Sequence, residues 1–206
     1  MARLIESCLI PGPAGNLEAR IEGPEHGQAR EACVVCHPHP LYGGTMHNKV
    51  VHRLARGLRR SGSVVLRFHF RGVGKSQGVY DRGIGEVEDA RAAMAWLRAR
   101  YPGLPLALAG FSFGARVILR LGCEEQGVSR LIALGTPTRG GGIEHLARCP
   151  TPKVFIQSTR DEFGPKMELE AAFSAFSEPK RLVWIEAADH FFRGGLDRLE
   201  QAIEGL

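Results

Sequence analysis

A serine at position 112 stands in a pattern typical of an enzyme nucleophile. Residues 110–114 read Gly-Phe-Ser-Phe-Gly, which fits Gly-x-Ser-x-Gly. A short apolar run, 104–109, precedes the pattern, and 115–121 continue with helical character. A serine on such a strand-to-helix turn presents its hydroxyl above the end of a sheet, close to the free N–H groups of a helix N-terminus. Because the chain contains 26 glycines, the pattern also arises by chance, so other residues must support it.

The supporting residues are an acid and a histidine further along the chain. A serine hydroxyl needs a histidine to accept its proton and a carboxylate to orient that histidine. Asp161 lies 49 residues after Ser112, and His190 lies 29 residues after Asp161; each directly follows an expected strand. The order Ser, Asp, His is one of those found in serine hydrolases. The sequence therefore predicts Ser112, Asp161 and His190 as a catalytic triad for acyl transfer.

The sequence also offers other roles for these residues. Glu162 and Asp189 are competing carboxylates, since each adjoins a proposed triad member. Asp161 could instead cap the helix expected after Pro165, and His190 could be an ordinary loop histidine. We favour the triad because both residues follow strands in the matching order.

An acyl-transfer site also needs N–H donors for the oxyanion. The residue after the nucleophile supplies one, so Phe113 is expected there, and the loop after the third strand supplies the second. That loop is 37–46, and its prolines cannot donate. The candidates are His39, Leu41 and Tyr42. Leu41 is preferred because the run that begins at His39 is similar to a His-Gly-x-x-Gly oxyanion loop.

The elements that must position these residues follow from hydrophobic periodicity and turn signals. Two strands at 3–10 and 16–22 predict an antiparallel hairpin at a sheet edge. Further strands are expected at 32–36, 63–70, 104–109, 128–134, 153–157 and 180–186, and helices at 47–60, 84–101, 114–122, 165–176 and 195–204. This alternation predicts one α/β domain over 1–206, a mostly parallel sheet with helices on both faces. The loops at the carboxyl ends of its strands should converge on one rim.

The segment 136–150 is too short for a helical lid domain. We therefore expect an open cleft with apolar walls, to which Tyr42 and Phe191 contribute as substrate-binding residues. The remaining candidates for these walls are Phe111, Phe113, Phe163 and Phe192. Such a cleft suits short or medium acyl esters.

Composition and charge exclude several classes of protein. The chain is 44% hydrophobic and 24% charged, as in ordinary globular domains. Its net charge of +5 comes with no basic run interleaved with aromatic residues, so nucleic acid is not an expected partner. No apolar run could span a bilayer, and the first residues do not resemble a signal peptide. A cytoplasmic protein without a membrane partner is expected.

The five cysteines, an odd number, are expected to be reduced and not to form a disulfide framework. Cys33 and Cys36 form a Cys-x-x-Cys pattern within an apolar strand. Residues three apart on a strand point to opposite faces, so buried side chains are expected there and not a redox or zinc pair.

Two further patterns resemble binding motifs. Residues 74–76, Gly-Lys-Ser, match the end of a phosphate-binding loop, but position 69 is histidine where that motif needs glycine. The loop 71–78 is expected to support the oxyanion loop instead. Cys36, His37 and His39 fit no zinc pattern, so structural roles are expected for both histidines. The sequence predicts no metal and no cofactor.

Three motifs together carry a family resemblance. They are the His-Pro-His-Pro-Leu-Tyr-Gly-Gly-Thr-Met loop at 37–46, the Phe-Arg-Gly-Val-Gly-x-Ser-x-Gly loop at 70–78 and the Gly-Phe-Ser-Phe-Gly turn at 110–114. Over nearly its whole length the chain resembles the α/β-hydrolase superfamily, and more narrowly its small, lidless bacterial hydrolases, which are similar to dienelactone hydrolases and carboxylesterases. The acid loop often reads Gly-Asp-x-Asp in that group but is Ser-Thr-Arg-Asp at 158–161 here.

The resemblance implies Ser112, Asp161 and His190 as the triad of a carboxylesterase-like serine hydrolase that forms an acyl-enzyme. A small-molecule ester would be its substrate, and the chain would be a monomer or a homodimer. A thioesterase or peptidase on the same triad, and a non-catalytic binding protein of the same fold, remain alternatives.

Overall fold

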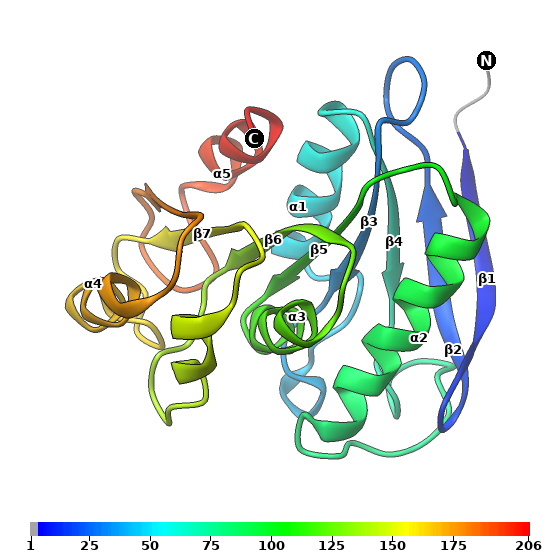
Figure 1. Cartoon of the computed structure of the whole chain (residues 1–206), viewed down its shortest axis with the longest axis horizontal. Helices are drawn as coiled ribbons and strands as arrows, with labels where there is room; N and C mark the ends of the chain where they lie inside the picture. Colours follow the sequence, from blue (N-terminus) through cyan, green and yellow to red (C-terminus); the bar gives the residue numbers. More distant parts are fainter. Residues whose placement is uncertain (1–3) are drawn as a thin grey trace.

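A single sheet organises the protein in this computed structural model, which describes residues 4–206 (Figure 1). The strands are β1 (Ile5–Gly12), β2 (Gly15–Glu22), β3 (Glu31–Cys36), β4 (Ser63–Phe68), β5 (Leu106–Phe111), β6 (Val128–Leu134), β7 (Lys153–Ser158) and β8 (Lys180–Ile185). They are arranged in the order β1-β2-β4-β3-β5-β6-β7-β8. β1 and β2 pair antiparallel, β2 pairs antiparallel with β4, and the remaining pairs are parallel.

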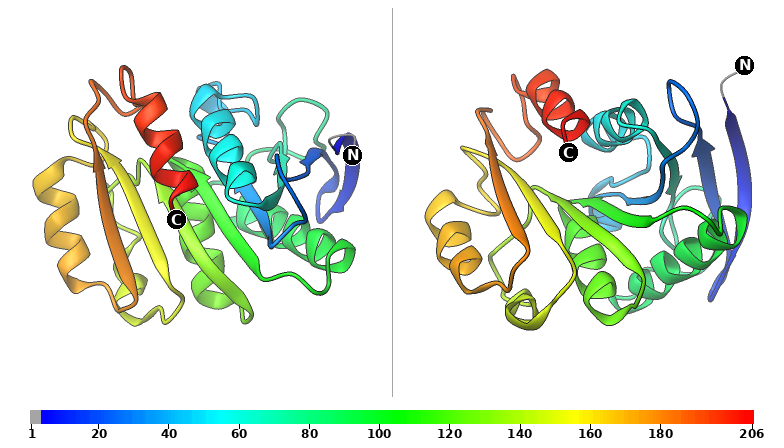
Figure 2. Two further views of the ribbon diagram at one scale, coloured as in Figure 1. Left: turned by 90° about the horizontal axis from the view of Figure 1, so that it is seen from above. Right: turned by 45° about the horizontal axis from the view of Figure 1, so that its top comes forward.

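Helices cover both faces of this sheet. They are α1 (Lys49–Arg60), α2 (Ile84–Arg100), α3 (Phe113–Glu124), α4 (Lys166–Ala175) and α5 (Leu196–Glu204). Figure 2 shows α1 and α5 side by side on one face and α2, α3 and α4 on the other. Each face therefore has its own apolar core, one with side chains of α2 and α3 and one with side chains of α1 and α5. No helix within residues 4–206 is both long and apolar enough to cross a membrane.

The sequence prediction of the fold class is confirmed. The sheet is mostly parallel, its N-terminal hairpin lies at the edge, and helices lie on both faces. Between β6 and β7 the structure contains only the short helix η2 (Glu144–Arg148), so there is no lid domain in this segment. The alternation of apolar strands and amphipathic helices was sufficient to predict this architecture.

Element boundaries differ by a few residues. The strand expected at 104–109 runs from Leu106 to Phe111, because Gly110 and Phe111 still pair with β6. The nucleophile candidate therefore follows the strand directly. The first strand, expected at 3–10, begins at Ile5, and position 3 lies outside the described residues. Cys33 and Cys36 are buried in the two different cores, as the strand pattern predicted, and burial raises the pKa of both thiols.

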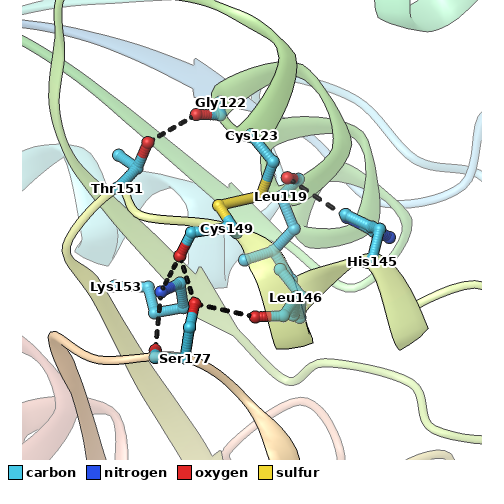
Figure 3. The surroundings of a disulfide bond; sticks show 9 residues. All are labelled: Leu119, Gly122, Cys123, His145, Leu146, Cys149, Thr151, Lys153 and Ser177. Atoms are coloured by element: carbon cyan, nitrogen blue, oxygen red, sulfur yellow. Dashed lines mark hydrogen bonds between the residues drawn. A yellow bond between two sulfur atoms is a disulfide. The ribbon is translucent and has the colours of Figure 1, made fainter.

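The prediction that all cysteines are reduced is wrong for two of them. Cys123, at the end of α3, forms a disulfide with Cys149, in the segment before β7 (Figure 3). The surrounding contacts position that segment. Lys153 Nζ donates to the carbonyl oxygen of Cys149 at 2.8 Å and to that of Ser177 at 2.9 Å, and Thr151 Oγ1 donates to Gly122 O at 2.8 Å. The pair could not be foreseen because 26 residues separate its members, which lie at the end of α3 and just after η2, and these elements meet only in the tertiary structure.

Reduction of this disulfide should destabilise the protein. A cross-link across 26 residues restricts the unfolded chain and contributes up to about 3.5 kcal/mol. We expect dithiothreitol to lower the free energy of unfolding, measured by urea denaturation, and the C123A/C149A variant to be insensitive to it. Cys8→Ala is the matched control and should respond like the wild type, since Cys8 is a free thiol. An unchanged urea midpoint on reduction, or five titratable thiols under denaturing conditions without reductant, would contradict this assignment.

Candidate active site

The nucleophile candidate lies on a tight turn between β5 and α3. Ser112 has φ 58° and ψ −116°, a conformation that side-chain-bearing residues rarely adopt. The turn requires close backbone contacts on both sides. A Cβ atom at Gly110 would lie 2.3 Å from the carbonyl oxygen of Gly114, and one at Gly114 would lie 2.4 Å from that of Cys36. Both glycines of the pentapeptide are therefore needed for α3 to pack against β5 and β3.

Three predicted side chains meet at the carboxyl end of the sheet. His190 Nε2 lies 2.8 Å from Ser112 Oγ, and His190 Nδ1 lies 2.7 Å from Asp161 Oδ2. A carboxylate accepts, so Nδ1–H donates to Asp161, and Nε2 is left to accept from the serine hydroxyl. His190 is 2% exposed and Asp161 is 3% exposed. The hydrogen-bonded chain is thus shielded from water except at Ser112.

The carboxylate of Asp161 is oriented by its own loop. Its Oδ1 accepts the backbone N–H groups of Phe163, at 2.9 Å, and of Gly164, at 3.1 Å. Its Oδ2 accepts from Gln157 Nε2 at 2.9 Å as well as from His190. Helix α4 begins later, with Pro165 at its N-cap, so Asp161 does not cap it. These donors stabilise a charged carboxylate and fix its plane toward the imidazole.

The two competing carboxylates hold the histidine loop. Glu162 Oε2 accepts the backbone N–H of His190 at 3.0 Å. Asp189 Oδ1 accepts the N–H groups of Phe191 and Arg193, both at 3.0 Å. Neither of these bonds involves the imidazole ring, so Asp161 alone of the three carboxylates bonds it. This role of Glu162 was not foreseen from the sequence.

The N–H groups of the loop 37–46 differ in whether they are already hydrogen-bonded. Leu41 N–H donates to His39 Nδ1 at 3.2 Å, and Tyr42 N–H donates to His39 O at 3.1 Å. Within residues 4–206, the N–H groups of His39 and Phe113 have no hydrogen-bond acceptor, and both residues line the cavity at Ser112. The turn that begins at Pro40 thus uses the Leu41 N–H internally, whereas the His39 N–H is free to bind an oxyanion.

The two histidines of this loop have structural contacts. His37 is fully buried; its Nε2 accepts the N–H of Phe70 at 3.0 Å, so its Nδ1–H donates to Pro38 O at 2.6 Å. Burial lowers the pKa of His37 to about 3, which keeps it neutral. Burial also lowers the pKa of His39, whose Nε2 lies 3.1 Å from Tyr80 Oη. His37 thereby ties the loop 37–46 to the end of β4.

A cavity of about 490 Å³ lies over Ser112. Tyr42, Phe163 and Phe191 line it, and all three are exposed. Phe111, in contrast, is fully buried and stacks on His190 with ring centroids 4.9 Å apart, and Phe192 is also in the core. Phe111 and Phe192 are therefore core residues beneath the site and not walls of the cavity. Asn48, Arg116 and Pro137 also line the cavity, although no sequence motif pointed to them.

The loop 71–78 lies elsewhere than expected. Instead of packing mainly on the oxyanion loop, it bonds to β2: Lys75 N–H donates to Glu18 Oε2 at 2.8 Å, and Gln77 N–H donates to Asn16 O at 2.9 Å. Phe70, just before this loop, bonds to His37. Within residues 4–206, no three His, Cys, Asp or Glu side chains are grouped as a metal site would require.

A Ser-His-Asp hydrogen-bonded chain at the carboxyl end of a mostly parallel sheet, with the serine on a strand-to-helix turn, defines the class of α/β hydrolases. A family model described as an alpha/beta hydrolase domain matches residues 41–198. The chain therefore belongs to the α/β hydrolase family, and it is a hydrolase by its family and its relatives.

Two solved structures and one further sequence are similar to this chain over most of its length. The structure of an alpha-beta serine hydrolase homologue from Coxiella burnetii is 40% identical, with a TM-score of 0.93 over 97% of this chain and 96% of that one. An a/b serine hydrolase without lid from Xanthomonas campestris is 34% identical, with a TM-score of 0.90 over 98% and 92% of the two chains. An uncharacterised protein of Rickettsia prowazekii is 36% identical over 93% of this chain and 84% of its own. These similarities support a small lidless hydrolase.

The buried His37 should make stability fall in acid. Because its pKa is about 3 in the fold and about 6.5 when unfolded, the unfolded chain gains a proton that the folded chain excludes between these values. The contribution is fully present above pH 6.5 and decreases by about 1.4 kcal/mol per pH unit below it. We expect His37→Gln to be less stable at neutral pH but to lose less stability on acidification, measured by urea denaturation from pH 7 to pH 4.

The exposed His26 provides the matched control: His26→Gln should keep the wild-type pH dependence. Equal pH slopes for wild type and His37→Gln would show that His37 does not exclude a proton.

Proposed function

We propose that the protein is a serine hydrolase that cleaves small and medium carboxylic esters through a covalent acyl-enzyme. The main support for this proposal is the hydrogen-bonded chain Ser112–His190–Asp161. Ser112 Oγ lies 2.8 Å from His190 Nε2, and His190 Nδ1 lies 2.7 Å from Asp161 Oδ2. It is the arrangement in which histidine can accept the serine proton while a buried carboxylate stabilises the resulting imidazolium.

In the proposed acylation step, Ser112 Oγ attacks the ester carbonyl carbon and His190 Nε2 accepts the hydroxyl proton. The carbonyl π electrons move onto oxygen, and the N–H groups of Phe113 and His39 stabilise this oxyanion. The tetrahedral intermediate then collapses. Its bond to the alcohol oxygen breaks, and His190 gives the proton to the departing alkoxide. Asp161 orients the ring throughout.

Water completes the proposed cycle. His190 accepts a proton from a water molecule, whose oxygen attacks the acyl carbon of the acyl-enzyme. The second tetrahedral intermediate releases the carboxylic acid, and His190 returns its proton to Ser112 Oγ. Because the cavity is open and no lid domain covers it, water reaches the acyl-enzyme without a conformational step.

The cavity supports the choice of substrate size. Its exposed aromatic walls, Tyr42 and Phe191, are proposed to contact the substrate, and its volume of about 490 Å³ is within the range for small-molecule sites. Without a lid, a long acyl chain would leave much of its apolar surface in water and gain little binding energy.

Removal of the nucleophile should abolish turnover. We expect Ser112→Ala to lower kcat for 4-nitrophenyl butyrate by about 10⁶-fold, and Asp161→Asn by about 10⁴-fold, because an amide cannot stabilise the imidazolium. Ser174→Ala, on the exposed face of α4, is the control and should match the wild type. Circular dichroism checks the fold of each variant.

A fluorophosphonate probe separates the alternatives. Covalent capture at Ser112 is expected, and its absence would favour a non-catalytic binding protein. Unchanged ester hydrolysis in Ser112→Ala would refute the mechanism, and faster turnover of a matched thioester or amide would assign a thioesterase or peptidase.

Chain length gives a further test. Across 4-nitrophenyl esters from acetate to palmitate, kcat/KM should be highest for short or medium acyl chains, since only these fit between the walls. A maximum at the longest chains would contradict the proposed substrate class.

A further inference from the structure

A second cavity, of about 390 Å³, adjoins the one over Ser112. Three arginines line it: Arg82, before α2, and Arg116 and Arg120, on α3. Among the described residues, no aspartate or glutamate lines this cavity. A concave surface with three guanidinium groups and no lining carboxylate attracts anions.

The two cavities share a boundary. His39, Phe113 and Arg116 line both. Arg116 and Arg120 lie four and eight residues beyond Ser112 on the same helix, which places their backbones about 6 and about 12 Å further along its axis. A group attached to an acyl chain on Ser112 can therefore reach the arginines.

The charges of these arginines are only partly compensated. Arg116 donates to the carbonyl oxygen of Gly141, a contact that orients the guanidinium and leaves further N–H donors. Arg120 pairs with Glu124 at 3.2 Å, but Glu124 is shared with Arg91 at 3.1 Å. Arg82 has no acidic partner among the described residues, and its φ of 54° is a strained conformation. Strain of this kind concentrates at functional sites.

A neutral donor accompanies the arginines. Because His39 Nδ1 accepts the N–H of Leu41, its proton is on Nε2, which donates to Tyr80 Oη at 3.1 Å. The Tyr80 hydroxyl, whose own proton is not used in that bond, lines the same cavity. It can donate to an anion there, and the raised pKa of Tyr80, caused mainly by burial, keeps it protonated.

The position of His190 decides which part of an ester faces this cavity. His190 gives its proton to the leaving alcohol in the proposed mechanism, and Phe163 and Phe191 flank its ring with centroids 4.8 and 5.4 Å away. These two aromatic residues line the first cavity and not the second. The alcohol part therefore lies beside them, and the acyl part extends toward His39, Phe113 and the arginines.

We propose that the second cavity binds a carboxylate at the far end of the acyl chain, so that the substrates are half-esters of dicarboxylic acids. This inference rests on the proposed esterase function and assigns its substrate class. Arg116 lies at the junction of the two cavities, and Arg82 and Arg120 bind the carboxylate beyond it. Guanidinium groups suit this role because their planar N–H pairs match a carboxylate.

The test compares 4-nitrophenyl half-esters of succinic to suberic acid with the same esters methylated on the free carboxylate. After subtraction of spontaneous hydrolysis, kcat/KM of the wild type should be at least about tenfold higher for the charged ester at one optimal chain length, as expected for one charge-assisted contact. The R82Q/R120Q variant should reduce this charged-to-neutral ratio about tenfold. Arg181→Gln removes one of the two charges that the double variant removes, at an exposed arginine on β8 that lines neither cavity, and should leave the ratio unchanged.

Each outcome decides one question. Equal kcat/KM for charged and methylated esters at all lengths, or an equal loss in Arg181→Gln, would overturn the carboxylate site while leaving the esterase intact. A wild-type protein that hydrolyses neither series would instead refute the esterase function on which the site rests. A length optimum that disappears in R82Q/R120Q supports the proposal, because general attraction to a basic protein has no preferred chain length.

Discussion

The strained backbone of Ser112 is the constraint on which the site depends. A residue with φ 58° between a central strand and a helix is unfavourable in isolation. This conformation persists because hydrogen bonds fix both sides of the residue. The Ser112 N–H donates to Leu134 O at 2.9 Å, and the Ser112 carbonyl oxygen accepts the N–H of Ala115 in α3. The absence of side chains at Gly110 and Gly114 allows the helix to approach the sheet closely enough for these contacts. The result is a hydroxyl held at the rim of the sheet beside the first N–H groups of a helix.

Burial and backbone hydrogen bonds, more than long-range charge, then organise the rest of the site. Asp161 is held by two backbone N–H groups and by Gln157, and Glu162 holds the backbone of His190. Phe111 stacks beneath the imidazole. Preorganisation of this kind means that the proposed reaction needs little rearrangement of the protein when charge develops. The loops can be irregular because each is anchored to the end of a buried strand.

Much of this arrangement was predictable, and the successes and failures have distinct causes. Apolar runs and helical periodicity depend on local sequence, so β3, β5 and α2 were recognised with small boundary errors. The Ser, Asp and His candidates could be found because each follows a strand, and parallel strands end at one rim. The preference for Leu41 relied on similarity to a motif, whereas the turn at Pro40 determines which N–H groups of this loop remain free.

The class of fold, the turn that carries Ser112 and the three side chains able to form its hydrogen-bonded chain could therefore be predicted from the amino-acid sequence, since they follow from local periodicity and chain order. Three features became visible only in the folded chain: Cys123 and Cys149 are joined, Glu162 holds the histidine loop, and three arginines line a cavity beside the nucleophile. Such contacts join residues distant in the chain. Their partners are selected by the packing of helices and loops on the sheet, which no local pattern encodes.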